Sequence, residues 1–110
     1  MQITIDLKKL DKKKKAKSTL VIKALKNFGV RGDLARWYFT QNSPEWIMRK
    51  CWMLDYYIDI DRAPKNKTAW LKAAIKHDYV EPEGFHEWFR RKKEKILNGS
   101  NDDLKQLILE

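Results

Sequence analysis

Few residues in this chain are of types that do chemistry: two histidines, His77 and His86, and one cysteine, Cys51. His86 and Glu87 open like the zinc-protease pattern H-E-x-x-H, but arginine occupies position 90 and the second histidine is missing. With no C-x-x-C pair and no tight His/Asp cluster, the spacing predicts no metal site. Cys51 falls on the apolar stripe of a predicted helix, which favours a packed thiol over a nucleophile. We therefore expect a non-enzymatic protein without catalytic residues, metal or cofactor.

Positive charge is the clearest signal in the composition. The net charge is +9 and the pI is near 9.7. Residues 1–17 contain seven lysines against two aspartates, and residues 90–95 contain five basic residues against one glutamate. The segment between these blocks is nearly neutral. Clustered lysine and arginine indicate a polyanionic partner, most simply nucleic acid, although lysine runs also serve as solubilising tails.

The candidate phosphate contacts combine these two blocks with basic residues on the predicted solvent faces of the helices between them. They are Lys12, Lys13, Lys14, Lys15, Lys17, Arg36, Arg49, Lys50, Lys72, Lys76, Arg90, Arg91, Lys92 and Lys93. The chain is also rich in aromatic residues, and core spacing does not account for Trp37, Trp46, Trp52 and Tyr56. Rings beside cations can stack on unpaired bases. They can equally anchor a protein partner.

Start and stop signals along the chain predict helices that would position these residues. Ser18 and Asp33 are candidate caps for helices over 19–28 and 34–40, and Gly29 is a stop signal for the first. Ser43, followed by proline and glutamate, predicts a helix from 44 to about 58. Further helices are expected over 67–77 with Asn66 as the cap, over 83–97, and over 102–109 with Ser100 or Asn101 as the cap. The fold class is therefore mainly α, a compact domain of five to six helices.

The N-terminal residues give a different pattern. Gln2 to Asp6 alternates like a short edge strand or an extended arm, and the lysine block over 8–17 is expected to be solvated and flexible. We predict a basic arm over 1–17, a helical domain over 18–99 and a short terminal helix over 100–110. A helix-turn-helix or winged-helix-like arrangement is compatible with these elements, but no recognition helix stands out.

Several segments together resemble a known module. They read L-V-I-K-A-L-K-N-F-G-V, then L-A-R-W-Y, S-P-E-W-I and K-N-K-T-A-W-L-K-A-A-I-K-H-D-Y-V-E-P-E-G-F. This series resembles a small helical module of replication initiator proteins from bacterial plasmids and related mobile elements. The matching positions are Phe28, Gly29, Val30, Glu45, Ile47, Asn66, Ala69, Leu71, Ala74, Ile75, Tyr79, Pro82 and Phe85. Lys67 departs from the pattern, which often has proline there. The resemblance covers about residues 20–90, implies a role in starting DNA replication and assigns no catalytic residue.

Two functions follow as hypotheses. The first is a DNA-binding module in the replication of a plasmid, phage or other mobile element, on single- or double-stranded DNA. The second is an adaptor that docks a primase, polymerase or helicase, or a second copy of itself. No apolar run reaches the ~18 residues of a membrane span, and the N-terminal residues lack the apolar region of a secretory signal. With a single cysteine, these features favour a cytoplasmic protein without a membrane partner.

Overall fold

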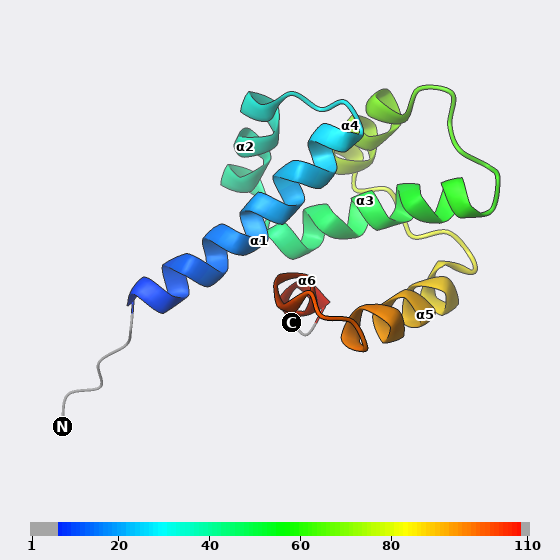
Figure 1. The fold of residues 1–110 in the computed structure, drawn as a ribbon. Coiled ribbons are helices and arrows are strands. Elements are labelled where there is room, and N and C mark those ends of the chain that lie inside the picture. The colour runs from blue at the N-terminus through cyan, green and yellow to red at the C-terminus, as the bar shows by residue number, and fades with distance from the viewer. Residues whose placement is uncertain (1–6, 109–110) are drawn as a thin grey trace.

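The computed structural model describes residues 7–108, and these residues form six helices (Figure 1). They are α1 (Leu7–Asn27), α2 (Gly32–Gln41), α3 (Pro44–Asp59), α4 (Lys67–His77), α5 (Phe85–Leu97) and α6 (Asp102–Ile108). No strand occurs between residues 7 and 108. The prediction of a mainly α domain with five to six helices is confirmed, whereas the expected strand at residues 2–6 lies outside the described residues.

Helix α3 is the centre of the fold. Helices α1, α4, α5 and α6 all pack against it, and α2 packs against α1. Ile47, Cys51 and Leu54, which form a stripe at helical spacing, are fully buried. In Figure 1, α2 and α4 lie on one side of α3, and α5 and α6 lie on the other. This central helix therefore separates two faces of the molecule.

Three of the predicted caps are present. The Ser43 side chain accepts a hydrogen bond from the Trp46 backbone N–H at 3.3 Å and starts α3. Asn66 accepts from Ala69 at 3.0 Å and starts α4. Asn101 accepts from Leu104 at 3.0 Å and starts α6. Each cap satisfies a backbone donor that the first turn of a helix leaves unpaired.

Gly29 ends α1 as predicted. Its φ is +89°, and Val30 donates back to the Leu25 carbonyl at 3.0 Å, which closes the helix end. Val30 is buried and supplies the apolar contact. A Cβ at position 29 would also lie 2.5 Å from the Thr68 hydroxyl, and this hydroxyl donates to the Phe28 carbonyl. Glycine therefore allows both the turn and the close approach of α4.

The first helix begins earlier than predicted. We expected it after Ser18, with a flexible lysine block before it, but α1 begins at Leu7 and crosses the predicted boundary after residue 17. Lysine is a good helix former, and extending an existing helix requires no new nucleus. Repulsion between lysines one turn apart costs only about 0.2–0.5 kcal/mol per pair. The first half of α1 extends beyond the other helices (Figure 1).

The expected cap of α2 is wrong. Asp33 is not the cap of α2, because the helix begins at Gly32 with Arg31 at the cap position and Asp33 in the first turn. Half of the residues of α3 are buried, including Met48, Trp52 and Met53. Within residues 7–108, no helix is both long enough and apolar enough to cross a membrane.

Candidate nucleic-acid interface

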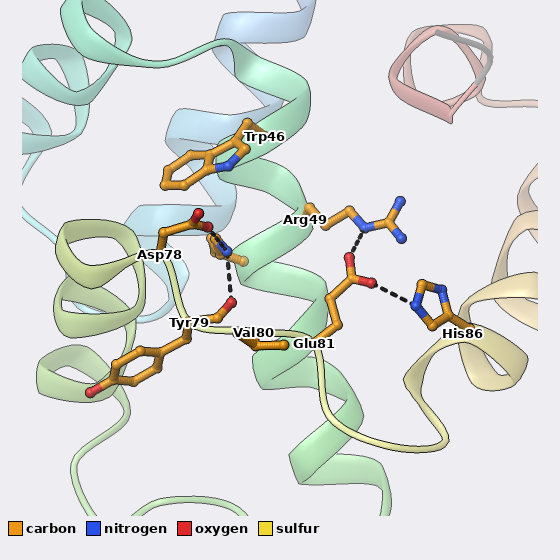
Figure 2. A pocket seen from close by; sticks show the side chains of 8 residues that line it. Trp46, Arg49, Asp78, Tyr79, Val80, Glu81 and His86 are labelled. Atoms are coloured by element: carbon orange, nitrogen blue, oxygen red, sulfur yellow. Dashed lines mark hydrogen bonds and ion pairs between the residues drawn. The ribbon is translucent and has the colours of Figure 1, made fainter.

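The segment that joins α4 to α5, residues 78–84, is held against α3 by partly buried polar contacts, and we call it the strap (Figure 2). The Lys50 ammonium group donates to a carboxylate oxygen of Asp78 at 2.7 Å and to the Tyr79 carbonyl at 2.8 Å. It also lies 4.8 Å from the centre of the Trp46 ring. The Lys50 side chain is only 6% exposed. Lys50 therefore anchors the strap and does not present its charge to a phosphate.

Arg49 has a similar structural role. Its guanidinium donates to Glu81 of the strap, and the other oxygen of that carboxylate lies 3.1 Å from His86 (Figure 2). The guanidinium also lies over the Phe89 ring, 4.6 Å from its centre. A space of about 470 Å³ borders these side chains, but both of its basic residues, Arg49 and Lys50, already face a carboxylate. We therefore do not place a polyanion there.

Three of the four candidate stacking residues are engaged inside the protein. Trp52 is 3% exposed and packs on Phe89, with ring centres 5.0 Å apart. Tyr56 is 8% exposed, and its hydroxyl donates to the Glu83 carbonyl at 2.9 Å. Trp46 is half-buried beneath Lys50. The rings of Trp52 and Tyr56 belong to the core and cannot receive a base in this conformation.

The two basic blocks also divide into paired and exposed residues. Lys17 is buried and lies 3.0 Å from Glu45, so it joins α1 to α3. The side chains of Lys12, Lys13, Lys14 and Lys15 lie outside the described residues. On α5, Arg90 and Arg91 are 69% and 71% exposed. Lys92 and Lys93 are half-buried over the rings of Trp88 and Phe89.

Three of the remaining candidates meet in an open groove between α2 and α4, which we call the α2–α4 groove. It encloses about 730 Å³. Its lining residues are Leu34, Trp37, Tyr38, Gln41 and Asn42 on the α2 side, and Lys72, Ala73, Ile75, Lys76 and His77 on the α4 side. Trp37, Lys72 and Lys76, three residues that the sequence singled out, are thus brought together.

The Trp37 side chain is exposed, with 54% of its surface accessible to solvent. Its ring touches the buried ring of Tyr38, 5.7 Å away between centres and tilted by 58°. The rest of the indole is free to accept a planar partner. An exposed indole is costly to keep in water, so Trp37 is a candidate contact residue of the groove.

Lys72 and Lys76 are exposed and lie one helical turn apart on α4. Neither makes a hydrogen bond or an ion pair with any described residue. No aspartate or glutamate is among the residues that line the α2–α4 groove. Arg36 is not among the lining residues, because its guanidinium lies near the Lys26 side chain at the start of α2, beside Gly32. The groove therefore carries uncompensated positive charge, unlike the strap.

No pattern in the sequence indicates that Gln41, Asn42 and His77 complete the groove. Gln41 and Asn42 line it at the end of α2, and the His77 ring is nearly parallel to the Tyr79 ring, 19° apart in plane and 6.4 Å between centres. Tyr79 is 37% exposed. In the sequence Gln41 and Asn42 are ordinary helix-end residues, and only the tertiary arrangement, with α2 packed on α1 and α4 packed on α3, brings them to the groove.

Burial sets the protonation of three groups near these elements. Burial raises the pKa of Tyr38, so its phenol stays a neutral donor at the groove. Burial, and then the charge of Asp55, raise the pKa of the Cys51 thiol, which keeps it from acting as a thiolate at neutral pH. Burial also raises the pKa of Asp55, while Lys92 opposes and Asp59 reinforces that shift.

No three histidine, cysteine or carboxylate side chains gather as metal ligands within the described part of the chain.

Comparisons with protein-family models, with curated proteins and with solved structures found no match to this chain. The resemblance to plasmid replication initiators therefore stays a prediction from the quoted segments, and the functional argument depends on the geometry of the site.

Proposed function

We propose that this protein is a non-catalytic DNA-binding module that holds an unpaired strand in the α2–α4 groove. One observation supports this most directly. An exposed indole, Trp37, and two lysines without carboxylate partners, Lys72 and Lys76, line the same groove. Single-strand binders combine these two features, an aromatic surface for a base and a basic wall for the backbone.

The geometry suggests how the parts divide the work. Lys72 and Lys76 are separated by about 6 Å along α4, since each residue of a helix rises about 1.5 Å. This spacing lets them contact the backbone of one strand at successive points. Trp37 faces them across the groove and offers its ring to a base. Stacking of this kind contributes about 1–3 kcal/mol per base and tolerates any sequence.

The cellular setting that we propose is DNA replication of a plasmid, phage or other mobile element, in the cytoplasm. The support for it is the likeness of residues 20–90 to the initiator module, and the single cysteine favours a reducing compartment.

An adaptor function has weaker support. Val80 is 88% exposed on the strap, but isolated exposed apolar residues are ordinary. We therefore do not add partner docking to the proposal.

The test is a fluorescence anisotropy titration of a labelled single-stranded DNA oligonucleotide over a range of salt concentrations. The test variant is Lys72→Glu/Lys76→Glu. The matched control is Lys23→Glu/Lys65→Glu, which makes the same change in net charge at two exposed positions away from the groove. Losing two backbone contacts should lower the slope of log affinity against log salt by about 1.4.

The control should keep a slope near that of the unmodified protein, with a smaller and uniform loss of affinity. Absence of binding at ~50 mM salt would contradict the proposal, because phosphate contacts are strongest at low salt. An equal loss of slope in the test variant and the control would also contradict it, since the groove would then have no special part.

A further inference from the structure

The second basic block forms a separate surface along α5, which we call the α5 basic face. It comprises Arg90, Arg91, Lys92, Lys93 and Lys95. Helix α5 contains only two acidic residues, Glu87 and Glu94, against these five cations. Arg90 and Arg91 share one carboxylate, that of Glu87, at 3.5 and 3.3 Å. All three side chains are more than 60% exposed. Exposed ion pairs of this kind are weak, so both guanidiniums can exchange Glu87 for a phosphate.

Unlike the α2–α4 groove, the α5 basic face presents charge without an open ring. The Lys93 ammonium group lies 4.8 Å from the centre of the Phe89 ring, and Phe89 is itself buried. The Lys92 ammonium group lies 5.6 Å from the centre of the Trp88 ring, whose indole N–H donates to Asp59 at 2.8 Å. A base would find no free aromatic surface here. A duplex, whose bases are already paired and whose phosphates face outward, suits such a face.

The two surfaces lie on opposite sides of α3. Helices α2 and α4 are on one side and α5 is on the other (Figure 1). Both α4 and α5 pack directly on α3. Half of the residues of the central helix are buried, and it lies between the two surfaces. One protein molecule can therefore contact two segments of nucleic acid at once.

We propose that the protein recognises a junction between single-stranded and duplex DNA. The unpaired strand occupies the α2–α4 groove, and the α5 basic face holds the backbone of the adjoining duplex. This inference rests on the proposed function for the groove and adds a second surface with a different ligand. Linking two modest sites in this way makes the second contact intramolecular, which can raise the overall affinity by about 10²–10⁴-fold.

Three labelled probes test the proposal: a single strand, a blunt duplex, and that duplex with a single-stranded tail of about 4–16 nucleotides, the range of site sizes in single-strand binders. We expect the tailed duplex to bind at least about tenfold more tightly than either simple probe at the same salt concentration. The variant Arg90→Glu/Arg91→Glu should remove this advantage and leave single-strand affinity nearly unchanged. Lys72→Glu/Lys76→Glu should weaken both the single strand and the tailed duplex.

The outcomes separate this inference from the proposed function. If single-strand binding depends on Lys72 and Lys76 but the tailed duplex gains nothing, the junction inference is wrong and the groove proposal stands. The junction inference is also wrong if Arg90→Glu/Arg91→Glu lowers all three affinities no more than the Lys23→Glu/Lys65→Glu control. If Lys72→Glu/Lys76→Glu changes the affinity for none of the three probes, the proposed function is wrong, and the junction inference that rests on it is wrong as well. Circular dichroism spectra of each variant confirm that the helices are retained.

Discussion

The ammonium group of Lys50 and the carboxylate of Asp78 form a hydrogen-bonded ion pair of 2.7 Å in which only one partner is buried. The Lys50 side chain is 6% exposed, and the Asp78 side chain is 73% exposed. Asp78 is also the residue that ends α4, with a left-handed φ of +47°. The pair thus fixes the end of α4, and with it His77 and one wall of the α2–α4 groove.

We expect the cost of a substitution at Asp78 to depend on two properties of the new residue. These are whether it can accept the hydrogen bond from Lys50 and whether it tolerates a positive φ. Asp78→Asn keeps an oxygen acceptor and a residue type that tolerates positive φ, so it should cost less than about 1 kcal/mol. Asp78→Val removes the acceptor and places a β-branched residue in the left-handed region, which should cost about 2–4 kcal/mol. Urea unfolding of the two variants measures this difference. Equal stability of the two would show that neither the pair nor the φ angle matters.

Trp37 should contribute to binding and not to stability. Trp37→Ala should change the free energy of unfolding by less than about 0.5 kcal/mol, because the side chain is exposed. The same change should weaken single-strand binding by about 1–3 kcal/mol, the value of one stacked base. Trp37→Phe, which keeps a smaller ring, should lose less. A titration in which all three proteins bind equally would remove the indole from the interface.

The contribution of Asp55 to the free energy of unfolding should be larger in mild acid than at neutral pH. Its pKa in the folded protein lies above the ordinary value of about 3.9 because of burial, with Lys92 opposing and Asp59 reinforcing the shift. Between those two pKa values the folded state binds more protons than the unfolded state. Stability contributed by the protonated carboxyl is therefore lost as the pH rises through that window.

The variant Asp55→Asn isolates this effect from other titrating groups. It removes the charge, so it should unfold at a higher temperature than the parent protein at pH 7. The gain should shrink below about pH 4, where the aspartate of the parent is protonated in both states. Thermal unfolding at several pH values measures the difference. A gain that does not change with pH would mean that ionisation of Asp55 is not its cause.

Gly84 should tolerate no side chain. Its φ is +87°, and a Cβ there would lie 2.7 Å from the Tyr56 hydroxyl, which donates to the Glu83 carbonyl. Gly84→Ala should cost about 2–4 kcal/mol from the left-handed backbone and this contact together. In a Tyr56→Phe background the contact is absent, so the additional cost of Gly84→Ala should fall toward about 1–2 kcal/mol. Equal costs in both backgrounds would leave backbone strain as the sole cause.

Local signals determined most of the helical framework. The side chains of Ser43, Asn66 and Asn101 satisfy backbone donors at the starts of their helices, and Gly29 ends α1, because these are interactions between residues close in sequence. The start of α1 differs from the prediction, because a run of like charges indicates a flexible segment although lysine itself favours helix. Continuation from a packed segment overrode charge repulsion there.

Caps, stop signals and apolar spacing in the sequence predict five to six helices, and the composition alone shows the positive charge and the surplus of aromatic residues. The tertiary structure alone decided which of those charges and rings face solvent. Lys50 and Lys72 look alike in the sequence, yet one is buried against Asp78 and the other lines an open groove. Trp52 and Trp37 differ in the same way. The physical reason is that exposure and pairing depend on contacts between distant segments, and helical periodicity specifies a face but not the neighbour that covers it.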